Sequence, residues 1–210
     1  ITERKQVEEA VELGVPCLVI NNKVEDLDVN YIAIDNLLGG EIAADYLISL
    51  GHTKIAIVTG NLATQAGLQR FEGFKNILAK RKIPLPEGYV YKGDYSRRSA
   101  RIAAEQFFQL KELPTAIFAC SDDMALELMA VSNEKGLQVP KDISIIGFDD
   151  NPACLYSPVA LTTIKQPLFL MAEEAVRSLN TIITKQIVTK KKVVLPPELI
   201  VRESCSSPKK

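Results

Sequence analysis

The chain has 210 residues, of which 47% are hydrophobic and 24% are charged, and its 25 basic and 26 acidic side chains leave a formal net charge of −1. This composition is typical of a globular protein with a sizeable core and excludes a disordered chain. Because the charges nearly balance, the polypeptide lacks the positive field that strong nucleic-acid binding needs, so any DNA contact must come from elsewhere.

Neither a membrane span nor a metal site is indicated. The longest apolar runs, such as IAIV at 55–58, fall far short of the ~20 residues that cross a bilayer, and the opening ITERKQVEEA does not read as a signal peptide. The chain contains a single histidine, His52, and no CxxC pair, so we expect no metal and no other cofactor. We expect a cytoplasmic protein whose four cysteines are reduced, buried and structural: Cys17, Cys120, Cys154 and Cys205.

Short β-rich runs alternate with longer amphipathic segments along the first 150 residues. After a charged, helix-like opening, the expected strands are residues 16–21, 30–35, 54–60, 88–93, 115–120 and 143–148. Most of these runs are continuously apolar, which indicates strands buried on both faces of a parallel sheet.

Apolar residues between these strands recur at helical spacing. The four stripes are Ala43, Leu47 and Leu50; Phe71, Phe74 and Leu78; Ala103, Phe107 and Leu110; and Met124, Leu128 and Val131. After LTTIKQP comes a fifth stripe at Ala172, Val176, Leu179 and Ile183, and then the strand-like KVVLPPELIVRES. The alternation predicts an α/β chain built on doubly wound parallel sheets.

The elements are unevenly shared between two parts of the chain. Residues 54–148 hold enough strand and helix repeats for one complete lobe, whereas the first fifty residues hold too little sheet to close a core. A helix and a strand that follow a finished lobe indicate that the chain returns to the first one. We therefore expect two lobes, of which the first is incomplete.

Polar residues follow each expected strand, where ligands of open parallel sheets bind. They are Asn21, Asn22, Asn61, Arg70, Asp94, Tyr95, Ser121, Asp122, Asp149, Asp150 and Asn151. Amide and carboxylate oxygens accept from hydroxyl groups, an arginine donates to two oxygens, and an aromatic ring covers an apolar sugar face. This set suits a polyhydroxylated ligand, although the same residue types also favour turns and helix caps.

Enzyme motifs are missing from the sequence. There is no GxSxG, GxxxxGK[ST] or GxGxxG pattern, and His52 in LGHTK has no patterned nucleophile near it. We expect His52 to be a structural hydrogen-bonding residue at a lobe junction. Asp149 and Asp150 are adjacent on one loop, and we expect them to point apart rather than to act as a catalytic pair.

Several segments together resemble the effector-binding core of the lactose and galactose repressor (LacI/GalR) family of bacterial transcription regulators. They are VNYIAIDNLLGGEIAADYLISLGHTKIAIVTG, RFEGF, PTAIFACSDDMALELM, GLQVPKDISIIGFDD, SPVALTTIKQP and LPPELIVRES. The resemblance implies two lobes like those of periplasmic sugar-binding proteins, joined by three crossovers, which we place near Gly51, Thr163 and Thr189. The first lobe would comprise residues 1–51 and 164–189, the second 52–163 and 190–205, with a tail at 206–210.

The resemblance also implies a ligand set and a mechanism. Matched by position, the ligand residues would be Ile20, Asn21, Arg70, Tyr95, Ser121, Asp149, Gln166 and Leu168. A sugar-like effector would bind between the two lobes of one subunit. The first lobe and the helices around 65–80 and 96–110 would form the interface of a homodimer. The effector would alter operator binding by a helix-turn-helix domain that this chain lacks. We further expect that Arg70→Ala removes most sugar binding but leaves the fold intact.

Two other functions stay open at this point. A solute-binding protein of a sugar transporter would use the same two lobes, and a sugar-acting enzyme could share the doubly wound fold. The LGH junction, the VRES tail and the unpaired cysteines favour the regulator, and the missing catalytic motifs argue against the enzyme.

Overall fold

The computed structural model describes residues 4–21, 27–185 and 191–209, and these fall into two units. Unit 1 comprises Ile1–Asp35 and Pro167–Pro196, and unit 2 comprises Asn36–Gln166 and Pro197–Lys210. The chain thus passes between the units three times, as expected. Each unit is an α/β structure with a largely parallel sheet, which confirms the predicted fold class.

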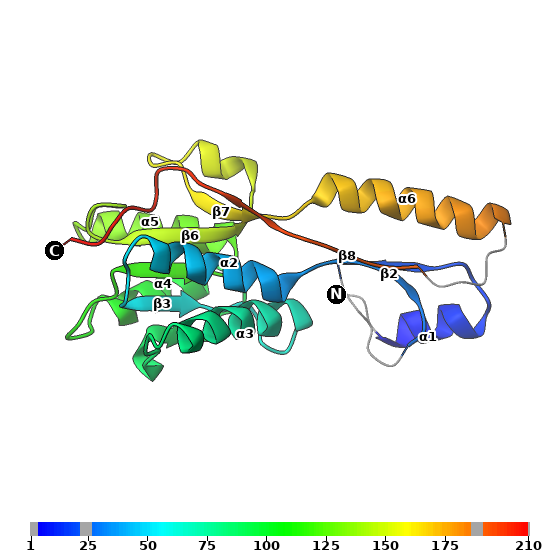
Figure 1. The fold of residues 1–210 in the computed structure, drawn as a ribbon, viewed down its shortest axis with the longest axis horizontal. Coiled ribbons are helices and arrows are strands. Elements are labelled where there is room, and N and C mark those ends of the chain that lie inside the picture. The colour runs from blue at the N-terminus through cyan, green and yellow to red at the C-terminus, as the bar shows by residue number, and fades with distance from the viewer. Residues whose placement is uncertain (1–3, 22–26, 186–190, 210) are drawn as a thin grey trace. The chain divides into compact units, whose positions relative to one another are not determined.

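Unit 1 is a three-stranded parallel sheet covered by a helix on each face (Figure 1). The strands run in the order β1 (Leu18–Ile20), β2 (Asn30–Ile34), β8 (Lys192–Leu195), and the helices are α1 (Arg4–Glu12) and α6 (Leu168–Lys185). Val7 of α1 packs with Val19 and Val29 on one side. Met171 and Ala175 of α6 pack with Ile32 on the other. Because successive strand residues point to opposite faces, both faces of this small sheet are apolar.

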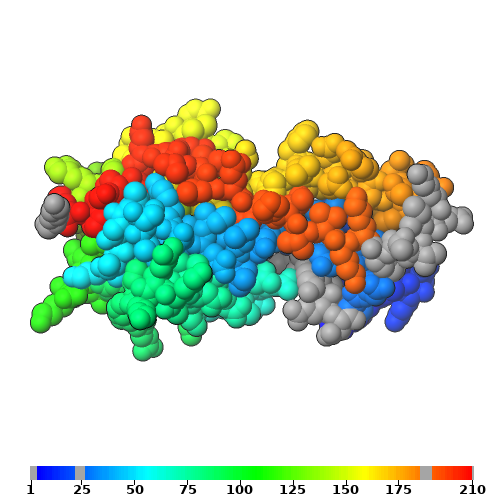
Figure 2. Space-filling view, in the orientation of Figure 1, coloured from blue at the N-terminus to red at the C-terminus, as the bar shows by residue number. Residues whose placement is uncertain are grey.

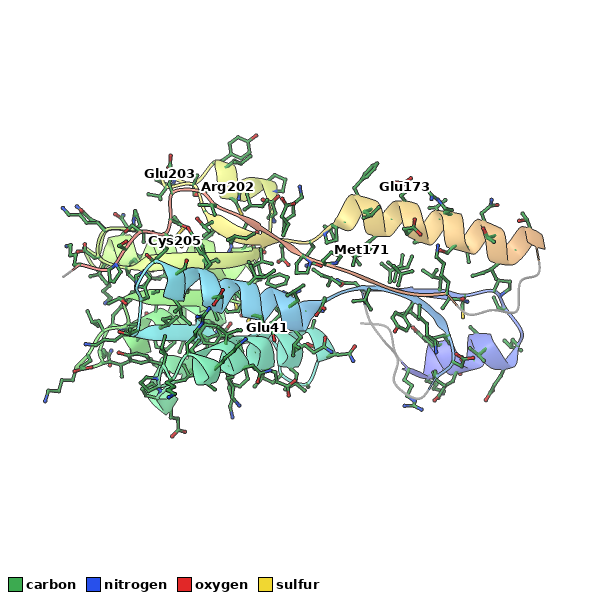
Figure 3. All side chains as sticks on the ribbon, in the orientation of Figure 1. Glu41, Met171, Glu173, Arg202, Glu203 and Cys205 are labelled. Atoms are coloured by element: carbon green, nitrogen blue, oxygen red, sulfur yellow. The ribbon has the colours of Figure 1, made fainter. Side chains whose placement is uncertain are left out.

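Helix α6 packs on the sheet through a different side from the one predicted. Its buried residues are Met171, Ala175 and Ser178, whereas Val176 and Ile183 of the predicted stripe are 72% and 57% exposed. Met171 and Glu173 extend from opposite sides of the helix in Figure 3. The helix carries apolar residues on two sides, and periodicity alone does not tell which side meets the sheet.

Unit 2 is built on a six-stranded sheet in the order β4-β3-β5-β6-β7-β9, in which only the pairing of β9 is antiparallel. Its strands are β3 (Ile55–Val58), β4 (Val90–Tyr91), β5 (Ala116–Ala119), β6 (Ser144–Asp149), β7 (Thr162–Lys165) and β9 (Glu198–Ile200). Every residue of β3 and β5 is buried, as their continuously apolar sequences predicted.

Two pairs of helices cover this sheet. They are α2 (Asn36–Ser49) with α3 (Gln65–Lys80), and α4 (Arg97–Phe107) with α5 (Asp122–Glu134); short 3₁₀ turns lie at Glu87–Tyr89 and Pro152–Leu155. Right-handed crossovers to opposite sides of β3 place α3 on one face and α4 with α5 on the other. Ser121 caps α5, since its side chain accepts from the backbone N–H of Met124.

The first predicted boundary between the parts was wrong because α2 belongs to unit 2. Helices α2 and α3 cross backbone to backbone at two glycines. A Cβ on Gly40 would lie 2.1 Å from the carbonyl oxygen of Arg70, and one on Gly73 would lie 2.0 Å from that of Leu37. The crossover therefore falls between Asp35 and Asn36 instead of near Gly51.

The other two predicted boundaries also move. Thr163 lies within β7, paired with β6 and β9, and the chain leaves unit 2 only after Gln166. Thr189 lies outside the described residues. The run KVVLPPELIVRES is not one strand, because β8 pairs with β2 of unit 1 whereas β9 pairs with β7 of unit 2, and the chain passes between the units at Pro196 and Pro197.

The end of the chain lies on the surface of unit 2, where the red segment of Figure 2 runs along the cyan of α2. The Pro208 ring lies 3.8 Å from where a Gly51 Cβ would stand, and Ser204 donates to the carbonyl oxygen of Ile145. The predicted tail from 206 onward is thus tied to the core, as Ser206 hydrogen bonds show.

His52 is a structural residue, as expected, but it lies inside unit 2 and not at a junction. The residue is 1% exposed, and its ring lies within hydrogen-bond distance of Thr115, Ser144 and the carbonyl oxygen of Ser206. Burial lowers the pKa of this imidazole.

All four cysteines are free thiols. Cys120 and Cys154 are buried, as expected, whereas Cys17 and Cys205 are only partly buried, which corrects the prediction for those two. Within the described part of the chain, no helix is long and apolar enough to cross a membrane.

Candidate functional site

The carboxyl ends of the five parallel strands of unit 2 meet at one edge of its sheet. This edge carries five of the predicted ligand residues or the helices that hold them: Arg70, Tyr95, Ser121, Asp149 and Gln166. Open parallel sheets bind their ligands at this edge because the strands end and the helices begin there. The contacts among these five side chains decide what the edge can bind.

Arg70, in the second turn of α3, is the most firmly held of them. Its Nε donates to Asn36 Oδ1 at 2.9 Å, and its Nη1 donates to the carbonyl oxygen of Cys120 at 2.7 Å. The guanidinium carbon lies 3.6 Å from the centre of the Phe148 ring, a close cation–π contact. The side chain is therefore fixed by α2, β6 and the end of β5.

This environment corrects the expectation that Arg70→Ala would leave the fold intact. Arg70 is 4% exposed, so its removal would leave a hole and unpair buried acceptors. Asn36 and Phe148, which hold the guanidinium, were not identified from the sequence. Phe148 reads there as an ordinary core residue of a strand, and Asn36 as a helix start.

Asp149, the last residue of β6, faces Arg70 and Gln166. Its Oδ1 lies 3.7 Å from Arg70 Nη1 and accepts from Gln166 Nε2 at 2.5 Å. Burial raises the pKa of the Asp149 carboxyl to about 6, although Arg70 and the Gln166 hydrogen bond pull it down. At pH 7 the group is mostly ionised and can accept hydrogen bonds from a ligand.

Tyr95 lies in a cradle that glycines make possible. A Cβ on Gly60 would stand 2.0 Å from the Tyr95 ring, and one on Gly67 would stand 3.1 Å from its hydroxyl oxygen. The backbone of Tyr95 has φ = 70°, a left-handed conformation that turns the ring inward. The Arg70 guanidinium carbon lies 6.0 Å from the ring centre.

Two polar atoms of this group are buried without a hydrogen-bond partner: the Tyr95 hydroxyl and Gln166 Oε1. Burial raises the pKa of the Tyr95 hydroxyl, while the Arg70 charge and the nearby Thr64 side chain lower it. A tyrosine hydroxyl is protonated at neutral pH in any case and can donate. Buried polar atoms are normally paired, so unpaired ones mark a place where water or a ligand completes the network. The group thus holds a hydroxyl donor and an amide acceptor with almost no accessible surface, beside the Asp149 carboxyl, whose side chain is 35% exposed.

Ser121 lies at the same edge, but its side chain already serves α5. Its hydroxyl oxygen accepts from the backbone N–H of Met124 at 3.3 Å, and the residue is 6% exposed. Its own hydroxyl hydrogen can still be donated, since an N-cap uses only the acceptor.

The remaining predicted ligand residues lie in unit 1. Ile20 ends β1 and is 50% exposed. Asn21 follows in a left-handed conformation, φ = 59°, with its backbone N–H donating to the carbonyl oxygen of Ile32. Leu168 begins α6 and is 55% exposed. Asn22 lies outside the described residues.

Other polar residues of the edge are explained by turn and cap chemistry, the alternative that the sequence left open. The Asn61 side chain accepts from the N–H of Ala63, and Asp94 accepts from Ser96. Asn151 caps the 3₁₀ turn Pro152–Leu155. Asp150 points away from Asp149, as predicted, and is paired with Arg202 at 2.5 Å.

A metal centre is not indicated by the described residues, since among 4–21, 27–185 and 191–209 no group of three or more histidine, cysteine or acidic side chains is placed to hold an ion. What Arg70, Tyr95, Asp149 and Gln166 offer instead is hydrogen bonding of both polarities beside an aromatic ring. Such a set can recognise a small molecule that carries several hydroxyl groups.

Comparisons with known proteins agree with this picture. Residues 44–205 match the family described as periplasmic binding protein-like domain. The probable HTH-type transcriptional repressor ExuR of Bacillus subtilis is 34% identical over 193 residues, which are 92% of this chain and 58% of ExuR. The chain thus spans about three fifths of the length of the curated relatives it matches.

Solved structures show the same relationship. The transcriptional regulator CelR in complex with cellobiose matches with a TM-score of 0.87 and 31% identity, over 94% of this chain and 61% of CelR. A LacI family transcriptional regulator from Enterococcus faecium with bound ribose matches with a TM-score of 0.89 and 27% identity, over 99% of this chain and 77% of that one. The predicted resemblance is confirmed: the chain belongs to the periplasmic binding protein-like domain family, in the form found in LacI-family transcription regulators.

Proposed function

We propose that this chain is the effector-sensing part of a bacterial transcription regulator and that it binds a small sugar-like ligand through Arg70, Tyr95, Asp149 and Gln166. The observation that carries the proposal is the pair of buried, unpaired atoms, the Tyr95 hydroxyl and Gln166 Oε1, beside the Asp149 carboxylate. A ligand hydroxyl can accept from the tyrosine and donate to the amide or carboxylate oxygen, so a sugar completes the network that the free protein leaves open.

The solved relatives support this ligand class, since one holds cellobiose and another ribose. They also favour a regulator over the solute-binding protein and the enzyme, because the named relatives are transcription regulators. Ile20, Asn21 and Leu168 stay predicted ligand contacts, to be tested by substitution.

DNA binding would reside in a helix-turn-helix outside this chain, as the names of the curated relatives indicate for those proteins. The effector would then have to bind one conformation of the whole regulator more tightly than the other. A typical coupling of about 1–3 kcal/mol would change operator affinity roughly 5- to 150-fold. We place the regulator in the cytoplasm, where its operator lies.

We also propose a homodimer that involves α3 and α4. Both helices expose apolar side chains, Leu68 at 42% and Ile102 at 36% exposure, which a partner would cover. Sedimentation tests this: a monomer at high protein concentration would contradict the proposal.

The ligand itself is found by a thermal-shift screen of pentoses, hexoses, disaccharides, phosphorylated sugars and nucleobases, followed by calorimetry. For a sugar that binds, Gln166→Met keeps the side-chain volume but removes the amide, so we expect the affinity to fall about tenfold or more. Gln109→Met, at an exposed position, is the matched control. If no sugar or sugar derivative binds, or if Gln166→Met binds the sugar as the wild type does, the proposed site is wrong.

A further inference from the structure

Asp122 is a buried carboxylate that the proposed ligand contacts do not use. It is the first residue of α5 and is 1% exposed. Its Oδ1 accepts from the Thr163 hydroxyl at 2.5 Å, and its Oδ2 accepts from the backbone N–H of Asn151 at 2.7 Å. Capping α5 requires none of this, because the Ser121 side chain already does so.

Room for this carboxylate is made by a glycine. A Cβ on Gly147, in the middle of β6, would stand 2.3 Å from Asp122 Oδ1. The carboxylate therefore lies against the backbone of β6, between that strand and Thr163 of the neighbouring strand β7. Burial raises the pKa of Asp122, while the hydrogen bonds from Thr163, Asn151 and Cys154 favour its ionised form.

The segment 149–151, to which Asp122 is hydrogen-bonded, has a strained backbone. Asp149 has φ = 123° and Asp150 has φ = 61°, so two consecutive residues other than glycine lie at positive φ. Such conformations are unfavourable for residues other than glycine and persist only where the surroundings enforce them. Two hydrogen bonds hold the strained pair. Asn151, the residue that follows it, donates its backbone N–H to Asp122, and Arg202 donates to the Asp150 carboxylate at 2.5 Å.

The strained pair has a consequence for the ligand site. Asp149 and Asp150 are adjacent, yet one side chain meets Gln166 and the other Arg202. Thr163, the second partner of Asp122, lies three residues before Gln166 on the strand that leads to it. Asp122 thus contacts the chain two residues after Asp149 and three residues before Gln166.

We propose that Asp122 is a positioning residue: by fixing the N–H of Asn151 and the hydroxyl of Thr163, it holds the strained turn at 149–150 so that the Asp149 carboxylate faces Arg70 and Gln166. Its link to ligand binding rests on the proposed function. Its effect on the geometry of Asp149 does not, because that geometry exists in the free protein.

The test uses Asp122→Asn in the full chain without ligand. An asparagine side chain has one acceptor oxygen and no charge, so it cannot accept from both Thr163 and Asn151, and any bond that it keeps is no longer to a charged acceptor. Its NH₂ group could donate to the Thr163 hydroxyl but would face a donor at the Asn151 N–H. We expect amide exchange at Asn151 to become about tenfold faster or more, since one hydrogen bond to a charged group is lost. We also expect the carboxyl ¹³C resonance of Asp149 to shift. Its titration midpoint is compared in Thr163→Val, which keeps the Asp122 charge, because that charge itself raises the pKa of Asp149 and its removal would move the midpoint in any geometry.

Asp123→Asn is the matched control, because Asp123 is the next residue and its side chain is 56% exposed on the outside of α5. It should leave both signals as in the wild type. A folded Asp122→Asn protein with wild-type Asn151 exchange and an unchanged Asp149 resonance would overturn the proposal. If Asp122→Asn does not fold, Thr163→Val removes one holder of the carboxylate, and an unchanged Asp149 resonance in that variant would overturn it equally.

Ribose and cellobiose then serve as probes for the functional part. If the wild type binds either sugar, Asp122→Asn should weaken binding about tenfold, and the loss should disappear in an Asp149→Asn background, because coupled residues are not additive. Additive losses would show that Asp122 acts on the fold alone and would overturn its positioning role. Absence of wild-type binding would count against the proposed ligand class, while the resonance of Asp149 still decides whether Asp122 positions it.

Discussion

Replacing Arg70 by methionine should destabilise unit 2 as well as weaken ligand binding. Methionine roughly keeps the volume but removes the donors to Asn36 and Cys120 and the contact with the Phe148 ring. Hydrogen bonds from a charged donor contribute about 1.5–3 kcal/mol each, and a desolvated cation–π contact contributes about 2 kcal/mol. Part of this is offset because a charge no longer has to be buried, which leaves a net loss of about 2–4 kcal/mol.

The same substitution should act on Asp149. Arg70 is the main charge that pulls the pKa of this carboxyl down, so without it the pKa should rise above the wild-type value of about 6. A carboxyl with a raised pKa in the folded state stabilises the fold at low pH, and this contribution is lost as the pH rises through that pKa. The destabilisation caused by Arg70→Met should therefore be larger at pH 8 than at pH 5.

Urea unfolding at the two pH values measures the first effect, and an NMR titration of Asp149 measures the second. Arg81→Met is the matched control at the C-terminal cap of the same helix, because the Arg81 side chain is 53% exposed and its pair with Asp45 is a surface contact. We expect a change below about 1 kcal/mol. A loss below about 0.5 kcal/mol in Arg70→Met, with no change at Asp149, would refute the idea that Arg70 ties these elements together.

Three further substitutions or conditions test separate parts of the structure. Gly73→Ala places a Cβ against the backbone of Leu37, so it should destabilise unit 2 by about 2 kcal/mol or more. The control Gly88→Ala meets only the Leu110 side chain and should change the stability by less than about 1 kcal/mol, so equal unfolding midpoints of the two variants would contradict the close helix crossing. Tyr95→Phe removes an unpaired hydroxyl, so the free energy of unfolding should stay unchanged or rise by up to about 1 kcal/mol, while the affinity for sugar falls. A large loss of stability would mean that the hydroxyl already has a hydrogen-bond partner. Sugar affinity should fall as the pH drops through about 6, by about tenfold at pH 5, because Asp149 becomes protonated; a flat calorimetric profile would remove Asp149 from the site.

The strands and helices could be predicted because the sequence patterns that indicate them are local. β3 and β5 are continuously apolar and are buried on both faces. Ser121, the cap of α5, stands directly before a helix that begins where the apolar run of β5 ends. In these segments local preference and tertiary environment agree.

The boundaries between the two units could not be predicted in the same way. Helix α2 belongs to unit 2 because Gly40 of α2 lies against the backbone of α3 and Gly73 of α3 lies against the backbone of α2. These contacts link residues that are about thirty positions apart in the sequence. The split of the last strand-like run lies at Pro196 and Pro197, and it depends on pairing with β2 on one side and β7 on the other. Pairing between distant segments has no counterpart in the pattern of a single run.

The site was half predictable for a related reason. Position after a strand led to Tyr95 and Asp149, since carboxyl ends of parallel strands share one edge. The burial of Arg70 could not be read, because it results from Phe148 and the Cys120 carbonyl, which come from two other strands. The role of Asp122 was hidden by its place at a helix start, where an acidic residue is expected anyway.

A ligand titration followed by NMR tests the proposed effector site most directly. With selective labels on arginine, tyrosine, aspartate and glutamine side chains, a saturating sugar from the screen should shift the resonances of Arg70, Tyr95, Asp149 and Gln166, and the Asp149→Asn variant should bind it far more weakly. Saturable sugar binding that leaves all four resonances in place, or that survives unchanged in Asp149→Asn, would contradict the assignment of the effector site to this edge of the sheet.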